Sequence, residues 1–183
     1  MSQTPSAIDP AKVRVAAGSF WARLPLVGIL LALLGLGSAA GLAARGELRQ
    51  FYFSWLVAFL FFLTVSLGAL FFVLVQFATR SGWSVVVRRT AEHLMAPLPV
   101  FILLFVPVVA GLHELFHWSL ADAVAADPSL QHKQPYLNLG FFVARAAGYF
   151  VIWSGLGCWF RRRSLQQDDS GDQTLTRRLQ AVA

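Results

Sequence analysis

The chain has 183 residues, of which 57% are hydrophobic and only 13% are charged, and its formal net charge is +6. Soluble globular domains carry about 25% charged residues, so this composition argues against an ordinary soluble protein. Apolar runs of about 20 residues match instead the roughly 30 Å hydrocarbon core of a bilayer. The composition therefore predicts an all-α integral membrane protein.

Four apolar runs follow one another along the chain, at about residues 24–44, 51–78, 93–118 and 139–160. They predict an antiparallel bundle of four transmembrane helices over residues 24–160. Residues 1–23 precede it as an N-terminal segment, and residues 161–183 follow it as a basic and polar tail. Pro107, inside the third run, removes one helical hydrogen bond and predicts a kink there.

The basic residues are distributed unevenly between the two sides of such a bundle. One side, with both termini, holds eleven of the fifteen Lys and Arg residues: Lys12, Arg14, Arg23, Arg80, Arg88, Arg89, Arg161, Arg162, Arg163, Arg177 and Arg178. The other side holds Arg45, Arg49 and Lys133. This positive-inside bias predicts cytoplasmic termini in a bacterial inner membrane and explains the charge by topology and anionic lipid, without nucleic acid. Trp83 and Trp118 are expected at the two interfaces.

A polar cluster stands at the outer end of the third run, where His113, Glu114 and His117 interrupt apolar sequence. If the helix continues, the two histidines lie one turn apart on one face. Arg145 lies about 9 Å inside the fourth run, at a depth comparable to Glu114. Because ionisable groups near hydrocarbon are costly, we expect these four residues to form the functional site, with Glu114 paired to Arg145.

One interpretation of this cluster is an intramembrane zinc metalloprotease. His113, Glu114 and His117 satisfy the HExxH pattern, in which two histidines bind zinc and the glutamate activates water. A third protein ligand is required, and the downstream residues His132, Asp122 and Asp127 form no familiar pattern. The single cysteine, Cys158, excludes a CxxC zinc site and a covalent CxxCH haem attachment.

Two other interpretations remain open. Histidines and a carboxylate near the outer face can accept protons when a quinol is oxidised, because imidazole exchanges protons near neutral pH. Aromatic walls from the second and fourth runs would then hold the quinone ring and tail. Alternatively, His113, Glu114, His117 and Arg145 form a polar clamp between helices in a purely structural subunit.

Several stretches together resemble one known family. They are residues 54–63, 68–72, 83–89 and 111–118, Ala91 and Glu92, residues 133–139, and Phe141, Phe142, Arg145, Tyr149, Phe150 and Trp153. Over roughly residues 50–180 the chain resembles the quinone-binding F subunit of bacterial alternative complex III, in the NrfD/PsrC-like family of integral membrane proteins. Members of that family are longer and continue into a second helical bundle, so the resemblance covers their N-terminal half only.

The resemblance implies a subunit of a quinol:electron-acceptor oxidoreductase. Its partners would be other membrane subunits and subunits that carry haem c and iron–sulfur clusters. It implies no haem on this chain, a quinone or quinol as ligand, and a quinone-adjacent or proton-conducting site or a scaffolding role. In that family the histidine- and acid-bearing stretch does not belong to a peptidase.

Overall fold

The computed structural model describes residues 18–79 and 85–170, and every regular element within these ranges is helical. Three of these helices are long and apolar enough to cross a membrane, and a bent pair, Val87–Met95 with Val100–Ala110, raises the number to four. The predicted all-helical class is thus confirmed, and the apolar helices indicate a multi-pass membrane protein. The chain divides into two compact units, Met1–Glu47 and Leu48–Ala183, which are described separately.

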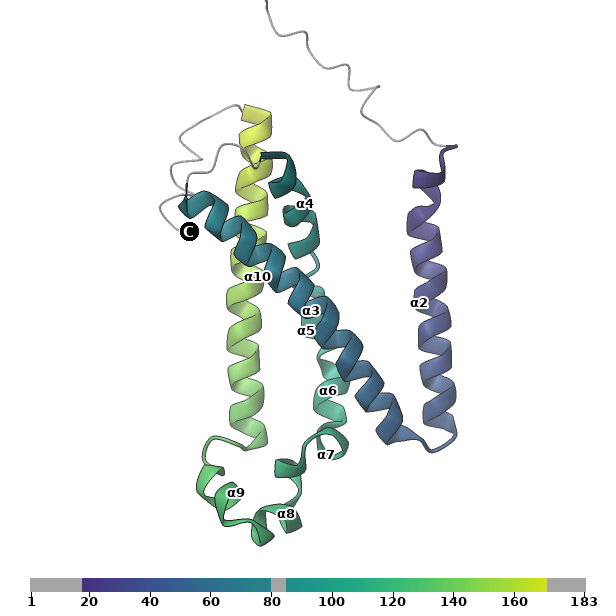
Figure 1. The fold of residues 1–183 in the computed structure, drawn as a ribbon, viewed down its shortest axis with the longest axis vertical. Coiled ribbons are helices and arrows are strands. Elements are labelled where there is room, and N and C mark those ends of the chain that lie inside the picture. The colour runs from purple at the N-terminus through teal and green to yellow at the C-terminus, as the bar shows by residue number, and fades with distance from the viewer. Residues whose placement is uncertain (1–17, 80–84, 171–183) are drawn as a thin grey trace, which may run out of the picture. The chain divides into compact units, whose positions relative to one another are not determined.

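The first unit contains one long helix, α2 (Phe20–Ala44), which begins four residues before the predicted span (Figure 1). Its large apolar side chains are exposed, with Leu31 at 64% and Leu34 at 72%. A helix that is apolar all round is stable in water only when it is buried, so a lipid environment is the natural one. The helix is followed by a turn at Gly46, whose φ of +81° suits a residue without a side chain.

The second unit is built on two long helices, α3 (Leu48–Ala78) and α10 (Leu139–Ser170) (Figure 1). Both begin within three residues of the predicted spans, but α10 continues ten residues beyond residue 160. Aromatic side chains form much of the core: the Phe59 ring of α3 lies 5.8 Å from Phe101 and 6.4 Å from Phe150 of α10. Such pairs contribute packing beyond their buried area.

The third predicted span, residues 93–118, is not one helix. Helix α4 (Val85–Met95) begins eight residues earlier and is followed by α5 (Val100–Leu104), α6 (Val106–Ala110) and α7 (Leu112–Leu115). A bend of 41° separates α4 from α5 and α6. Pro97 and Pro99 lie in the break, where their rings cannot continue an α-helical ladder.

Helices α5 and α6 are separated by a break at Phe105, two residues before Pro107, and a side chain from α3 bonds there. The Val108 amide donates to Phe105 rather than to Leu104, so the Leu104 carbonyl loses its usual partner. Trp55 Nε1 donates to that carbonyl at 3.0 Å. An indole hydrogen bond thereby replaces the missing backbone bond, which matters most where water is absent.

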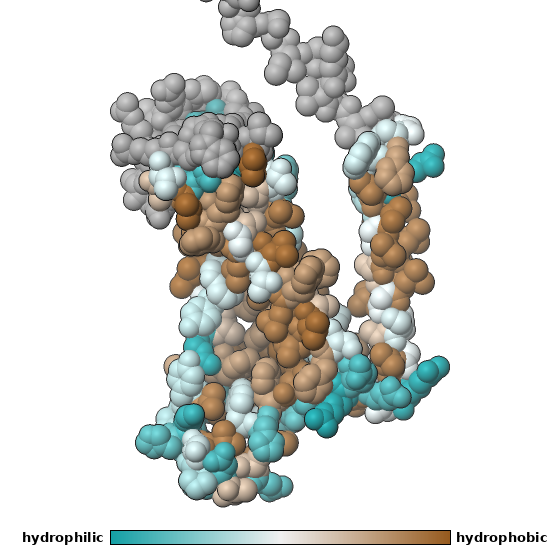
Figure 2. Space-filling view, in the orientation of Figure 1, coloured by the Kyte–Doolittle hydropathy of each residue, from teal (hydrophilic) through white to brown (hydrophobic). Residues whose placement is uncertain are grey.

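Short elements connect α7 to α10 and form the polar end of the unit. They are the 3₁₀ turn η1 (His117–Ser119), α8 (Ala121–Ala126) and α9 (Pro128–Lys133). Asp127 caps α9 by accepting from the Ser129 amide at 2.8 Å, and Asn138 accepts from the Phe141 amide at the start of α10. Figure 2 shows hydrophilic side chains gathered over α8 and α9, with hydrophobic ones over α3.

Candidate functional site

The histidine-bearing stretch does not continue as a helix, contrary to prediction. Helix α7 ends at Leu115, and Phe116 is extended, with φ −127° and ψ 116°, before His117 begins the 3₁₀ turn. His113 and His117 therefore do not lie one turn apart on a single helical face. His113, Glu114 and His117 are all exposed.

Aromatic packing explains where this helix ends. Phe116 lies 5.7 Å from Trp118, and both rings contact Phe142 of α10, at 5.9 Å and 5.5 Å. The Ser119 hydroxyl donates to the Leu112 carbonyl at 3.1 Å and to the Phe116 carbonyl at 2.7 Å. The extended residue turns two rings onto α10, and the Ser119 hydroxyl adds a second donor to two carbonyls that also accept backbone amides.

The predicted pair between Glu114 and Arg145 is not formed. Across residues 18–79 and 85–170, no ion pair joins these two side chains. Arg145 lies instead over the rings of Tyr136, at 4.0 Å, and Phe141, at 5.1 Å. Glu114 is exposed, and the arginine is held by cation–π contacts that sequence spacing did not indicate.

The geometry for zinc hydrolysis is also missing. No group of three or more His, Cys, Asp and Glu side chains that could hold a metal ion occurs within the described part of the chain. A catalytic zinc needs three protein ligands. The HExxH pattern is therefore present in the sequence, but residues 18–79 and 85–170 provide neither a continuous helix through it nor the third ligand that its chemistry requires.

His113 nevertheless borders a pocket. This pocket has a volume of about 630 Å³ and lies between α6, α7, α8 and the start of α10. Its lining combines apolar side chains with polar ones: Val109, Leu112, Trp118, Val124, Gln131 and Asn138. The volume falls within the range of small-molecule sites, about 300–1,000 Å³. Of the four predicted site residues, only His113 lines it.

A close approach between two helices places His113. Gly111, immediately before α7, faces Tyr52 of α3, and a Cβ atom at this position would overlap the tyrosine ring. Glycine is therefore required for α7 to pack this tightly against α3. Leu112 and His113 follow directly and both line the pocket, with Leu112 buried and His113 exposed.

A second pocket is almost wholly apolar. It has a volume of about 370 Å³ and lies between α3, α4 and α5, where Trp55, Phe59, Phe62 and Phe101 line it. The sequence predicted aromatic walls from the second and fourth runs, and this pocket is lined by residues of the second run but by none of the fourth. Its lining offers little to orient a polar head group.

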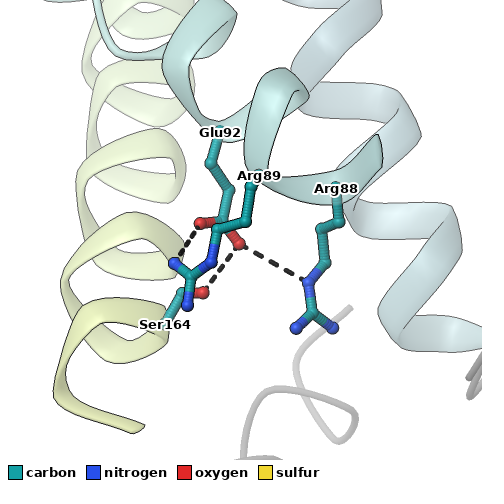
Figure 3. Close-up of polar contacts among 4 residues, drawn as sticks. All are labelled: Arg88, Arg89, Glu92 and Ser164. Atoms are coloured by element: carbon teal, nitrogen blue, oxygen red, sulfur yellow. Dashed lines mark hydrogen bonds and ion pairs between the residues drawn. The ribbon is translucent and has the colours of Figure 1, made fainter. Parts of the chain in front are cut away.

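A buried charged cluster at the opposite end of α10 was not predicted as a site. Glu92 of α4 is 3% exposed, and it accepts from Arg89 Nη1 at 2.8 Å and from the Ser164 hydroxyl at 2.7 Å (Figure 3). Arg88 Nε lies 3.6 Å from the same carboxylate, and its guanidinium lies 4.7 Å from the Phe77 ring. The cluster joins α4 to α10, because Ser164 is fully buried between them.

The spacing of Arg88, Arg89 and Glu92 carried part of this signal, because residues three and four apart are neighbours on a helix. The sequence instead suggested an interfacial amphipathic stretch anchored by Trp83, which lies outside the described residues. Trp118, the other predicted interfacial aromatic, is half-buried against Phe116 and Phe142.

Neither a protein-family model nor a curated protein matches this chain. The resemblance to the F subunit of alternative complex III therefore stays a prediction.

Proposed function

We propose that the chain is a multi-pass subunit of a quinol-oxidising assembly in a bacterial inner membrane, with four spans and cytoplasmic termini. The observation that supports it best is the pocket of about 630 Å³ that His113 borders. It combines a proton acceptor, an aromatic wall and amide side chains at one end of apolar helices, which is what a hydroquinone head group requires.

Each side chain in this proposal has its own role in quinol oxidation. The His113 imidazole accepts a proton from a quinol hydroxyl as the quinol loses electrons to redox subunits of the assembly. Trp118 provides a flat apolar surface for the quinone ring. Glu114 and His117 are exposed nearby and are available to pass the proton toward water, whereas Arg145 is not part of this site.

A zinc peptidase is not proposed, because the described residues offer no third ligand and the HExxH stretch is not helical throughout. A purely structural subunit is the second candidate. The buried Glu92 cluster favours it, since such a clamp holds α4 and α10 together and requires no ligand.

The first experiment is a purification of the tagged protein from its native membrane in a mild detergent. Companion chains are identified by mass spectrometry, and haem, iron, zinc and quinone are measured in the same sample. The proposal predicts companions with haem c and iron–sulfur clusters, together with quinone. A protein that purifies alone with about one zinc per chain would contradict it, and companions without quinone would favour the structural candidate.

A photoreactive quinone analogue locates the site within that complex. Labelling should fall on peptides that contain His113, Trp118 or residues 131–139, and excess natural quinol should suppress it. Labelling confined to the apolar pocket around Phe59 and Phe101 would place the quinone elsewhere on the chain.

A further inference from the structure

Arg145 is a cation inside an apolar helix, and no acidic side chain among the described residues pairs with it. It lies six residues after the start of α10, which is about 9 Å along the helix axis. Its guanidinium is held by Tyr136 and Phe141, which partly offset the cost of removing the charge from water. Nη1 is buried, and within the described residues it has no hydrogen-bond acceptor.

An unpaired donor of this kind is costly, because a buried polar group without a partner carries its full desolvation penalty. Aromatic faces stabilise the charge of a guanidinium, but they offer no hydrogen-bond acceptor along its N–H directions. An oxyanion would satisfy both, since a phosphate matches the planar fork of arginine.

A narrow apolar pocket adjoins the Arg145 side chain. It has a volume of about 190 Å³, and besides Arg145 its lining includes Phe59, Leu63, Phe105, Phe142, Tyr149 and Trp153. Two of its lining residues, Leu60 and Tyr149, are 47% and 49% exposed, so the pocket opens to the surface of the unit. Its volume is below that of sites for whole small molecules, about 300 Å³ and above, so it fits a segment of an acyl chain better than a ring with its tail.

We propose that Arg145 and this pocket form a specific site for an anionic glycerophospholipid. The phosphate accepts from Arg145 while part of an acyl chain fills the aromatic pocket between α3, Phe105 and α10. The depth of Arg145 in α10 agrees with a phosphate contact, because an arginine near a helix end reaches the head-group level by extending along the helix. A lipid with a net negative charge is favoured over a zwitterionic lipid, because a zwitterionic head group also carries an ammonium group. Within the described residues, no carboxylate pairs with Arg145 and could accept that ammonium group.

The test measures which lipids remain bound to the purified assembly after extensive washing in mild detergent. Wild type is compared with Arg145→Leu and with the matched control Arg49→Leu, an exposed arginine 5.7 Å from the Phe53 ring. Wild type and Arg49→Leu should retain phosphatidylglycerol or cardiolipin. Arg145→Leu should retain about tenfold less of these lipids, which corresponds to about 1.4 kcal/mol of binding free energy. Equal retention by Arg145→Leu would overturn the proposal, as would a zwitterionic lipid, a fatty acid or a quinone as the molecule that depends on Arg145.

If Arg145→Leu fails to assemble, Arg145→Lys provides the second measurement. Lysine keeps the charge but loses the planar fork. In nanodiscs, phosphatidylglycerol should raise the thermal midpoint of wild type and of Arg49→Leu more than phosphatidylcholine does, and this difference should shrink in Arg145→Lys. An undiminished difference would overturn the proposal.

Discussion

The two ends of the Leu48–Ala183 unit place their ionisable residues in opposite ways. At one end Glu92 is buried and bound by Arg89, Arg88 and Ser164. At the other end His113 and Glu114 are exposed beside a pocket. The first end contains charges that satisfy one another, whereas the second presents groups that can still exchange protons or meet a ligand.

The buried end contributes to stability, whereas the exposed end offers side chains that are available to react. A buried carboxylate whose oxygens are occupied by two arginines and a serine has little capacity left for a substrate, so the Glu92 cluster is best understood as a clamp. An exposed histidine contributes little to stability and is free to act. The HExxH pattern thus lies at the end where ionisable side chains are exposed, and the described residues offer no group of metal ligands there.

The largest expected effect comes from breaking the clamp. Glu92→Ala leaves Arg88 and Arg89 without their carboxylate, and we expect it to lower the free energy of unfolding by about 3 kcal/mol. The low end of the range for buried pairs applies because the two arginine side chains are 13% and 28% exposed. Denaturant titration in detergent measures the change.

Glu114→Ala is the matched control for that substitution, because it removes a carboxylate that is exposed. It should change the free energy of unfolding by less than about 0.5 kcal/mol. Equal losses for the two glutamate variants would remove the distinction between the two ends.

A smaller effect is expected where α7 meets α3. Gly111→Ala places a methyl group against the Tyr52 ring, and overpacking of this kind costs about 1–3 kcal/mol. Gly148→Ala in α10 is the control, because a Cβ there meets nothing within 4 Å and should stabilise the helix slightly. Thermal unfolding of both variants checks the sign, and a loss in Gly148→Ala equal to that in Gly111→Ala would count against the close approach.

The indole hydrogen bond at the break between α5 and α6 should contribute less to the free energy of unfolding. Trp55→Phe keeps an aromatic ring but leaves the Leu104 carbonyl without its donor, which should cost about 1 kcal/mol. Trp21→Phe in α2 is the control, since Trp21 is 67% exposed. If both tryptophan variants unfold at the same denaturant concentration, the indole does not replace the missing backbone bond.

The smallest effect is expected at the second histidine of the HExxH pattern. His117→Ala and removal of metal by a chelator should each change the free energy of unfolding by less than about 0.5 kcal/mol, because the side chain is exposed. A marked chelator-induced loss that His117→Ala abolishes would restore a metal site at this end.

The long helices were predictable because each is a continuous apolar run long enough to span a bilayer. The start of α3 at Leu48 and of α10 at Leu139 agree with the runs within three residues. Helix α4 was missed as part of the packed unit because its arginines looked interfacial, and burial of Glu92 depends on Ser164, 72 residues later. No local pattern contains that partner.

The site was predictable only in part, for the same reason. His113 was singled out because ionisable residues are rare in apolar sequence, and in the structure it borders a pocket. The end of α7 at Leu115 depends on rings of Phe116 and Trp118 that pack on Phe142, and the cation–π contacts of Arg145 depend on the fold of the connection after α9. The pairing of Glu114 with Arg145 was inferred from depth alone, and depth does not fix the direction of a side chain.

The most direct test of the proposed site is the quinol oxidation rate of the purified assembly with His113→Gln in this chain, compared with His132→Gln. His132 is exposed on α9 and does not border the pocket. Loss of a positioned proton acceptor typically costs a factor of about 100 or more, so His113→Gln should slow quinol oxidation by that order while His132→Gln leaves it unchanged. Equal rates for wild type and both variants, in assemblies of normal composition, would contradict the assignment of His113 to quinol chemistry.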